Sequence, residues 1–139
     1  MKRMRSEKGA ALLEAAVTVP IILLISVGIF EFGRAYQTQQ VLVNATREGA
    51  RLAVIEGTSD EAVFARVNDY VKAGGLNALN PADLDVKRNV AVAGTTASSV
   101  EVKYPFQFIV LNPVIRLISP SATAGGPGLM KAASVMRNE

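Results

Sequence analysis

The chain of 139 residues contains no cysteine, no histidine and no tryptophan. Without cysteine it forms no disulfides, so a domain outside the cytoplasm has to be held together by packing alone. Without cysteine and histidine it has no zinc finger, no thiol nucleophile, no imidazole base and no Ser-His-Asp triad. Any catalytic site would have to use carboxylates, lysine or tyrosine, and most classes of enzyme are therefore excluded.

Positive charge is concentrated at the N-terminus. The formal net charge of +3 arises mostly before residue 10, where Lys2, Arg3, Arg5 and Lys8 outweigh Glu7. The remainder of the chain is close to neutral and has no basic patch of the kind that binds nucleic acid. We therefore expect no nucleic-acid partner, and no residue pattern suggests a cofactor or a metal ion.

An apolar run of about 21 residues, from Ala10 to Phe30, follows this basic leader. At about 1.5 Å per residue a helix of this length spans a hydrocarbon core of roughly 30 Å. The basic leader predicts a cytoplasmic N-terminus, with the residues after about position 35 on the outside. A cleaved secretory signal is disfavoured, because its apolar core is shorter, about 7–15 residues, and is followed by small residues. Here the bulky Phe30 and Phe32 stand at that place.

Three regions are expected along the chain: a basic leader over residues 1–9, a transmembrane helix continuing as an amphipathic helix over residues 10–56, and a small extracytoplasmic head over residues 57–139. The long helix carries a row of small residues, Ala45, Gly49 and Ala53, at intervals of four. Such a row lets another backbone approach closely. We favour contact with the chain's own sheet, and contact with a neighbouring subunit is the alternative.

A second helix is expected after Gly57, with Thr58 or Ser59 as its N-cap and Gly74-Gly75 at its end. Its apolar face is expected to consist of Ala62, Val63, Val67, Tyr70 and Val71. Ahead of it, Arg47, Glu48 and Arg51 are expected to form a solvated charged face with one ion pair three residues apart.

Alternating apolar residues predict two strands joined as a hairpin. The first covers residues 84–92, where Arg88 interrupts the apolar side, and the second presents one apolar face made of Val100, Val102, Tyr104, Phe106 and Phe108. Pro105 places part of the second strand at an edge or a bulge. Residues 129–137 are expected to supply a last strand, and residues 120–128 a mobile segment. The fold class is therefore α+β and pilin-like, with two helices packed on a small antiparallel sheet.

The apolar residues 109–118 are too few and too interrupted for a second membrane span. They either pack into the core of the head or rest on the membrane surface, and the sequence does not decide between the two.

Glu14 is the one charged residue of the apolar run, and it stands five positions after Gly9. A charge inside a membrane costs about 2.5–3.5 kcal/mol on insertion scales, so an intramembrane carboxylate is treated as functional. If a peptidase cuts after Gly9, Ala10 carries a new ammonium group that a neighbouring subunit can present to Glu14, and this pair offsets the cost. The alternative is a plain one-span anchor whose Glu14 reaches the interface.

The chain resembles the TadE-like minor pilins, or pseudopilins, of bacterial tight-adherence (Flp-type) pili. The resemblance lies in residues 9–20, 28–34 and 45–53, and it covers about the first 55 residues. It implies cleavage between Gly9 and Ala10 by a membrane aspartic prepilin peptidase, with Glu14 as the assembly carboxylate.

The resemblance also implies a role in pilus assembly and surface adhesion, and a single-pass location in the bacterial inner membrane with the head outside. The implied partners are the prepilin peptidase, other pilin and pseudopilin subunits, the inner-membrane assembly platform and the lipid bilayer.

Two other functions are weighed against a pilus subunit. The first is an unprocessed inner-membrane protein whose head is a protein-binding module, with the row Ala45, Gly49 and Ala53 and the segment 109–118 as contact surfaces. The second is an enzyme. Its candidate carboxylates are Asp60, Glu61, Asp83, Asp85 and Glu101. We do not expect an enzyme, because each of these residues is already explained by a cap, a turn or a solvated strand face.

Overall fold

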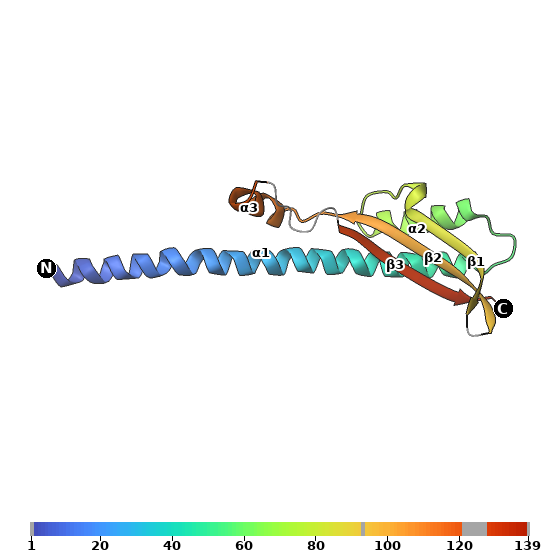
Figure 1. The fold of residues 1–139 in the computed structure, drawn as a ribbon, viewed down its shortest axis with the longest axis horizontal. Coiled ribbons are helices and arrows are strands. Elements are labelled where there is room, and N and C mark those ends of the chain that lie inside the picture. Colours follow the sequence, from blue (N-terminus) through green and yellow to red (C-terminus); the bar gives the residue numbers. More distant parts are fainter. Residues whose placement is uncertain (1, 93, 121–127, 139) are drawn as a thin grey trace. The chain divides into compact units, whose positions relative to one another are not determined.

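The computed structural model describes residues 2–92, 94–120 and 128–138. In chain order the elements are α1 (Lys2–Ala53), α2 (Asp60–Ala73), the short 3-10 helix η1 (Pro81–Asp83), β1 (Leu84–Val92), β2 (Thr95–Phe106), α3 (Leu111–Ile118) and β3 (Gly128–Arg137) (Figure 1). The expected α+β fold is confirmed: a long apolar N-terminal helix, a second helix and an antiparallel three-stranded sheet.

These elements fall into two compact units. One, here called the stem unit, comprises Met1–Gly33 and Phe108–Ala124. The other, here called the head unit, comprises Arg34–Gln107 and Gly125–Glu139. Each unit is described by itself below.

Helix α1 differs from the expected range of 10–56 at both ends. It begins at Lys2, so the described part of the leader is helical too, while Met1 lies outside the described residues. Gly9 does not end the helix, since a glycine in a helix costs only about 1 kcal/mol relative to alanine. Pro20 also lies inside α1. The helix ends three residues early, at Ala53, because the chain turns through residues 54–57 and Gly57 has a φ of +81°.

The sheet of the head unit has the strand order β1-β2-β3, with both pairs antiparallel. The expected last strand over 129–137 is confirmed as β3, while residues 121–127 of the expected mobile segment, and Ala93 of the hairpin loop, lie outside the described residues. The prediction for Pro105 is also confirmed. Strand β1 pairs with β2 only as far as Val102, so the end of β2 that carries Pro105 has a neighbouring strand on one side alone.

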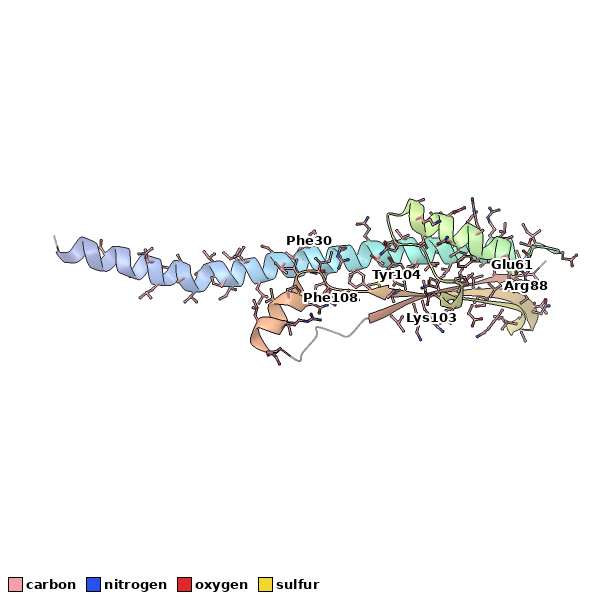
Figure 2. The ribbon with its side chains drawn as sticks, turned by 90° about the horizontal axis from the view of Figure 1, so that it is seen from above. Phe30, Glu61, Arg88, Lys103, Tyr104 and Phe108 are labelled. Carbon is pink, nitrogen blue, oxygen red and sulfur yellow. The ribbon has the colours of Figure 1, made fainter. Side chains whose placement is uncertain are left out.

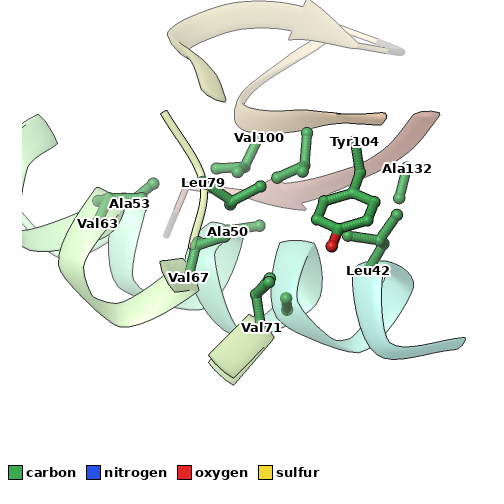
Figure 3. Packing of buried hydrophobic residues seen from close by; sticks show 12 residues of the cluster. Leu42, Ala50, Ala53, Val63, Val67, Val71, Leu79, Val100, Tyr104 and Ala132 are labelled. Atoms are coloured by element: carbon green, nitrogen blue, oxygen red, sulfur yellow. The ribbon is translucent and has the colours of Figure 1, made fainter. Parts of the chain in front are cut away.

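One face of the sheet packs against α2 and the C-terminal part of α1 to form the core (Figure 3). Its buried side chains are Leu42, Ala45, Ala50, Ala53, Val63, Val67, Val71, Leu79, Val100, Val102, Tyr104 and Ala132. The buried Tyr104 and the partly exposed Lys103 are adjacent in β2 and point to opposite faces of the sheet (Figure 2). The Tyr104 hydroxyl accepts a hydrogen bond of 3.1 Å from the Asn77 N–H, so this phenol is buried without losing its polar partner.

Two details of the predicted apolar faces are wrong. On α2, whose N-cap is Ser59 as expected, the buried stripe is Val63, Val67 and Val71, whereas Ala62 and Tyr70 lie off this i, i+4 row and are exposed. On β2, the strand ends at Phe106. Phe108 therefore does not continue its face, and belongs instead to the stem unit.

Arg88, which interrupts the apolar pattern of β1, closes the loop between α1 and α2. Its guanidinium donates to the carbonyl of Ala53 at 2.8 Å, to that of Thr58 at 2.7 Å and to the Asp60 carboxylate at 2.8 Å. The Ala53 carbonyl is one of those that a helix end leaves without an intrahelical partner. A register shift between Lys87 and Val90, with Asn89 at a φ of 56°, accompanies this inward turn of Arg88.

The row of small residues on α1 lies against the chain's own head. Ala45 and Ala53 are buried. A Cβ atom added at Gly49 would stand 2.5 Å from Val67 Cγ2 of α2 and 3.3 Å from Val100 Cγ1 of β2. The absence of a side chain at Gly49 therefore lets α2 and β2 approach the same point of α1.

The charged face beside this row contains more than the one ion pair expected. The Glu48 carboxylate accepts from Arg51 at 2.7 Å and also from Arg66 of α2 at 2.8 Å. These two guanidiniums, Arg51 first, hold the pKa of Glu48 at about 2, well below the usual 4.5. Glu48 thus joins α1 to α2 on the surface of the head.

Replacing Gly49 by Val should destabilise the head by about 1–3 kcal/mol, because the added methyl groups overpack the contact with Val67 and Val100. Gly33→Val is the matched control, since a Cβ at Gly33 meets no atom within 4 Å. Its effect should stay within about 0.5 kcal/mol. Chemical unfolding in detergent micelles, followed by circular dichroism, measures both. Equal effects of the two substitutions would contradict the close approach at Gly49.

The Glu48 cluster predicts a pH dependence with a defined sign. Because the pKa of Glu48 is lowered on folding, its contribution to the free energy of unfolding is present above pH 4.5 and is lost as the pH falls toward about 2. The stability difference between the natural chain and Glu48→Gln should therefore be largest at neutral pH and shrink across this interval. A difference that is constant from pH 6 to about 2 would contradict the cluster.

Candidate functional site: the exposed apolar segment of helix α1

The first half of α1 exposes an apolar surface that no described residue of the chain covers. Every residue from Gly9 to Ser26 is exposed, and the exposed fractions of Leu12 and Leu13 reach 71% and 73%. Within the described residues, α1 is the one helix that is long and apolar enough to cross a membrane. Contiguous apolar surface of this kind marks a region that contacts lipid or another protein.

The two residues at the expected processing site, Gly9 and Ala10, lie in helical conformation and are exposed. A Cβ atom at Gly9 would meet nothing within 4 Å. Packing within this chain therefore does not require a glycine there, in contrast to Gly49.

The expected assembly carboxylate, Glu14, is also exposed. It lies one helical turn after Ala10, on the same face of α1. Among the residues that the structure describes, no hydrogen bond or ion pair to Glu14 is formed. A group presented by another molecule has free access to it.

A second carboxylate of the stem unit, Glu31, was not assigned from the sequence. It directly follows Phe30, the last residue of the apolar run, and its exposed fraction is 0%. Glu31 Oε1 accepts a hydrogen bond from the N–H of Val110, the N-cap residue of α3. Val110 has no side chain that can cap its own helix, so Glu31 supplies this contact from α1. A carboxylate next to an apolar run is a visible signal, but its partner lies 79 positions away in the sequence.

For the segment 109–118 the sequence allows two places, the core of the head or the membrane surface. In the structure this segment is not part of the head core. Residues 111–118 form α3 in the stem unit, and none of residues 111–117 belongs to the buried cluster. Next to α3, the ring of Phe108 meets that of Phe32 edge-on, with centroids 6.3 Å apart. Of the two expectations for this segment, packing into the core of the head is therefore wrong.

Arg34 is the first residue of α1 that belongs to the head unit, and it binds the end of β2. The guanidinium lies 4.4 Å from the centre of the Phe106 ring and donates to the carbonyl of Gln107. A cation over an aromatic face and a charged hydrogen bond join the start of this unit's helix to the end of β2.

Three of the five carboxylates considered for an enzyme have partners within the chain. Asp60 binds Arg88, Asp83 accepts from Asn80 at 3.2 Å, and Asp85 pairs with Lys87 at 3.1 Å. Within the described residues no group of three or more potential metal ligands occurs. Each of these contacts joins neighbouring parts of the folded chain.

Comparison with known proteins gives one result, and it falls on the exposed helix. The family model of TadE-like proteins matches residues 9–51, which begin at Gly9 and include both Glu14 and Glu31. No curated protein and no solved structure matches the chain. Residues 9–51 are therefore similar to the TadE-like proteins, over about a third of the chain.

Proposed function

We propose that the chain is a minor pilin, or pseudopilin, of a tight-adherence pilus, inserted in the bacterial inner membrane and cut after Gly9 before assembly. The observation that carries the proposal is an uncovered apolar helix segment with one exposed carboxylate near its start, inside the region that matches the TadE-like family.

The apolar segment needs a cover, and the described residues of the chain do not supply one. Before assembly, lipid provides it, because the segment is long enough for a hydrocarbon core of roughly 30 Å. After assembly, the helices of neighbouring subunits take the place of lipid. Both environments are apolar, so moving the segment from one to the other costs little hydrophobic free energy.

Glu14 favours a particular arrangement of these neighbours. In an apolar environment its carboxylate needs a cation, and cleavage after Gly9 creates one at Ala10, one turn away on the same helix face. In a neighbouring chain displaced along the helix axis, this ammonium group meets Glu14. The pair then sets the register between subunits, because any other register leaves a buried charge without its partner.

The alternative of a head that acts as a protein-binding module loses one of its two proposed surfaces. Ala45 and Ala53 are buried, and Gly49 faces Val67 and Val100 of the same chain. The row is therefore not available to a partner while the head is folded. A partner of the head would have to bind elsewhere.

Cleavage is tested by intact-mass spectrometry of the protein from cells with and without a prepilin peptidase. The proposal predicts a chain that starts at Ala10 only when the peptidase is present, and no cleavage of Gly9→Leu. Gly28→Leu is the control, since Gly28 is also helical with no atom within 4 Å of its Cβ position. It should be cut normally. A natural chain that keeps its leader in the presence of the peptidase would contradict the proposal.

Assembly is tested separately with Glu14→Gln, which removes the charge and keeps the shape of the side chain. This variant should be cut normally but enter pili at least about tenfold less, since a loss of about 1.4 kcal/mol is a factor of ten. Glu7→Gln is the matched control, because Glu7 leaves with the leader and its change should have no effect. Immunoblots of sheared pili measure the incorporation. Equal incorporation of the two variants would exclude a role for Glu14.

A further inference from the structure

Helix α3 combines exposed apolar side chains with a cation. The exposed fraction of Leu117 is 86%, that of Ile109 just before the helix is 61%, and Arg116 is exposed beside Leu117. On the other side of the helix, Leu111, Val114 and Ile115 are partly buried. Helices that lie in the interface of a membrane have this composition, with apolar groups toward the acyl chains and a cation at the level of the phosphates.

The attachment of α3 fixes its depth along α1. The N–H of Val110 donates to Glu31, and the ring of Phe108 contacts that of Phe32. Both anchor residues lie within two positions of Phe30, the last residue of the apolar run. If residues 10–30 cross the hydrocarbon core, α3 begins at the level where hydrocarbon gives way to lipid headgroups.

The orientation of α3 relative to α1 is compatible with a position at the boundary between hydrocarbon and lipid headgroups. In Figure 2, α3 runs obliquely to the first part of α1.

We propose that α3 is a membrane-interface anchor, which binds the phospholipid surface on the side of the head through Leu117, Ile109 and Arg116 and is held at that depth by Glu31. The proposal rests on the proposed insertion of α1 in the membrane. The acyl chains take up Leu117 and Ile109, and a lipid phosphate pairs with Arg116. The buried carboxyl group of Glu31 acts as a positioning residue, since it contacts α3 and not the lipid.

The natural chain contains no tryptophan, so single substitutions provide unique probes of depth. Three full-length variants are reconstituted in phosphatidylcholine vesicles: Leu117→Trp in α3, Ile22→Trp in the apolar run, and Tyr70→Trp on the exposed side of α2. Quenching by lipids brominated near the headgroup or near the bilayer centre then reports the position of each probe.

Leu117→Trp should be quenched roughly twofold by the shallow brominated lipid, because interfacial helices sink about 5–10 Å into the headgroup–acyl boundary. Ile22→Trp should respond to the deep brominated lipid, and Tyr70→Trp to neither. If Ile22→Trp is not quenched, membrane insertion itself is wrong, and the proposal falls with it. If Ile22→Trp is quenched and Leu117→Trp is not, insertion stands and the interface anchor is overturned. That second result would include the case in which α3 contacts another protein chain.

The role of Glu31 is tested in the Leu117→Trp background. Glu31→Ala should reduce the shallow quenching, whereas Glu31→Gln, which keeps an acceptor oxygen for the Val110 N–H, should retain it. Glu56→Ala is the control, since Glu56 is an exposed carboxylate in the loop after α1. Circular dichroism verifies that each variant is folded. Equal quenching in Glu31→Ala and Glu56→Ala would show that Glu31 does not hold α3 in place.

Discussion

The uncovered apolar surface of α1 is the constraint on which the functional account depends. Every residue from Gly9 to Ser26 is exposed in the described part of the chain, and contiguous apolar surface of this kind marks a region that contacts lipid or another protein. In such surroundings each charged group has to find a partner. Glu31 already has one in the backbone of Val110, while Glu14 has none among the described residues of this chain. Glu31 therefore organises its own chain, and Glu14 is the carboxylate that we propose for assembly.

The second half of the same helix is covered by its own chain instead of being exposed. In the head unit, α1 has to receive both a helix and a sheet, and small residues allow this. Gly49 leaves room for Val67 and Val100, and Ala45 and Ala53 are buried in the same row. The polar edges of this packing are fastened by charged contacts, with Glu48 bound to two arginines and Arg88 bound to the end of α1. Helix α1 thus exposes apolar side chains in its first part and contributes to a protein core in its second.

Features that depend on neighbours in sequence could be predicted. The period of two in residues 84–106 gave the hairpin, and Ser59 with Gly74 gave the limits of α2, because caps and strand alternation are local. Contacts between distant residues could not be predicted in the same way. Nothing near Glu31 in the sequence points to Val110, and Arg88 looked like a flaw in a strand because its acceptors lie on other elements. For the same reason Phe108 was assigned to the strand that ends two residues before it.

The measurement that tests the central claim most directly is a zero-length carbodiimide cross-link in assembled pili, analysed by mass spectrometry. The account predicts an amide bond between the α-amino group of Ala10 in one subunit and the Glu14 carboxylate of a neighbouring subunit. This single product would demonstrate cleavage after Gly9, the pairing of the two charges and their position between subunits. Assembled chains that still carry their leader, or that begin at Ala10 but never cross-link through Glu14, would contradict it.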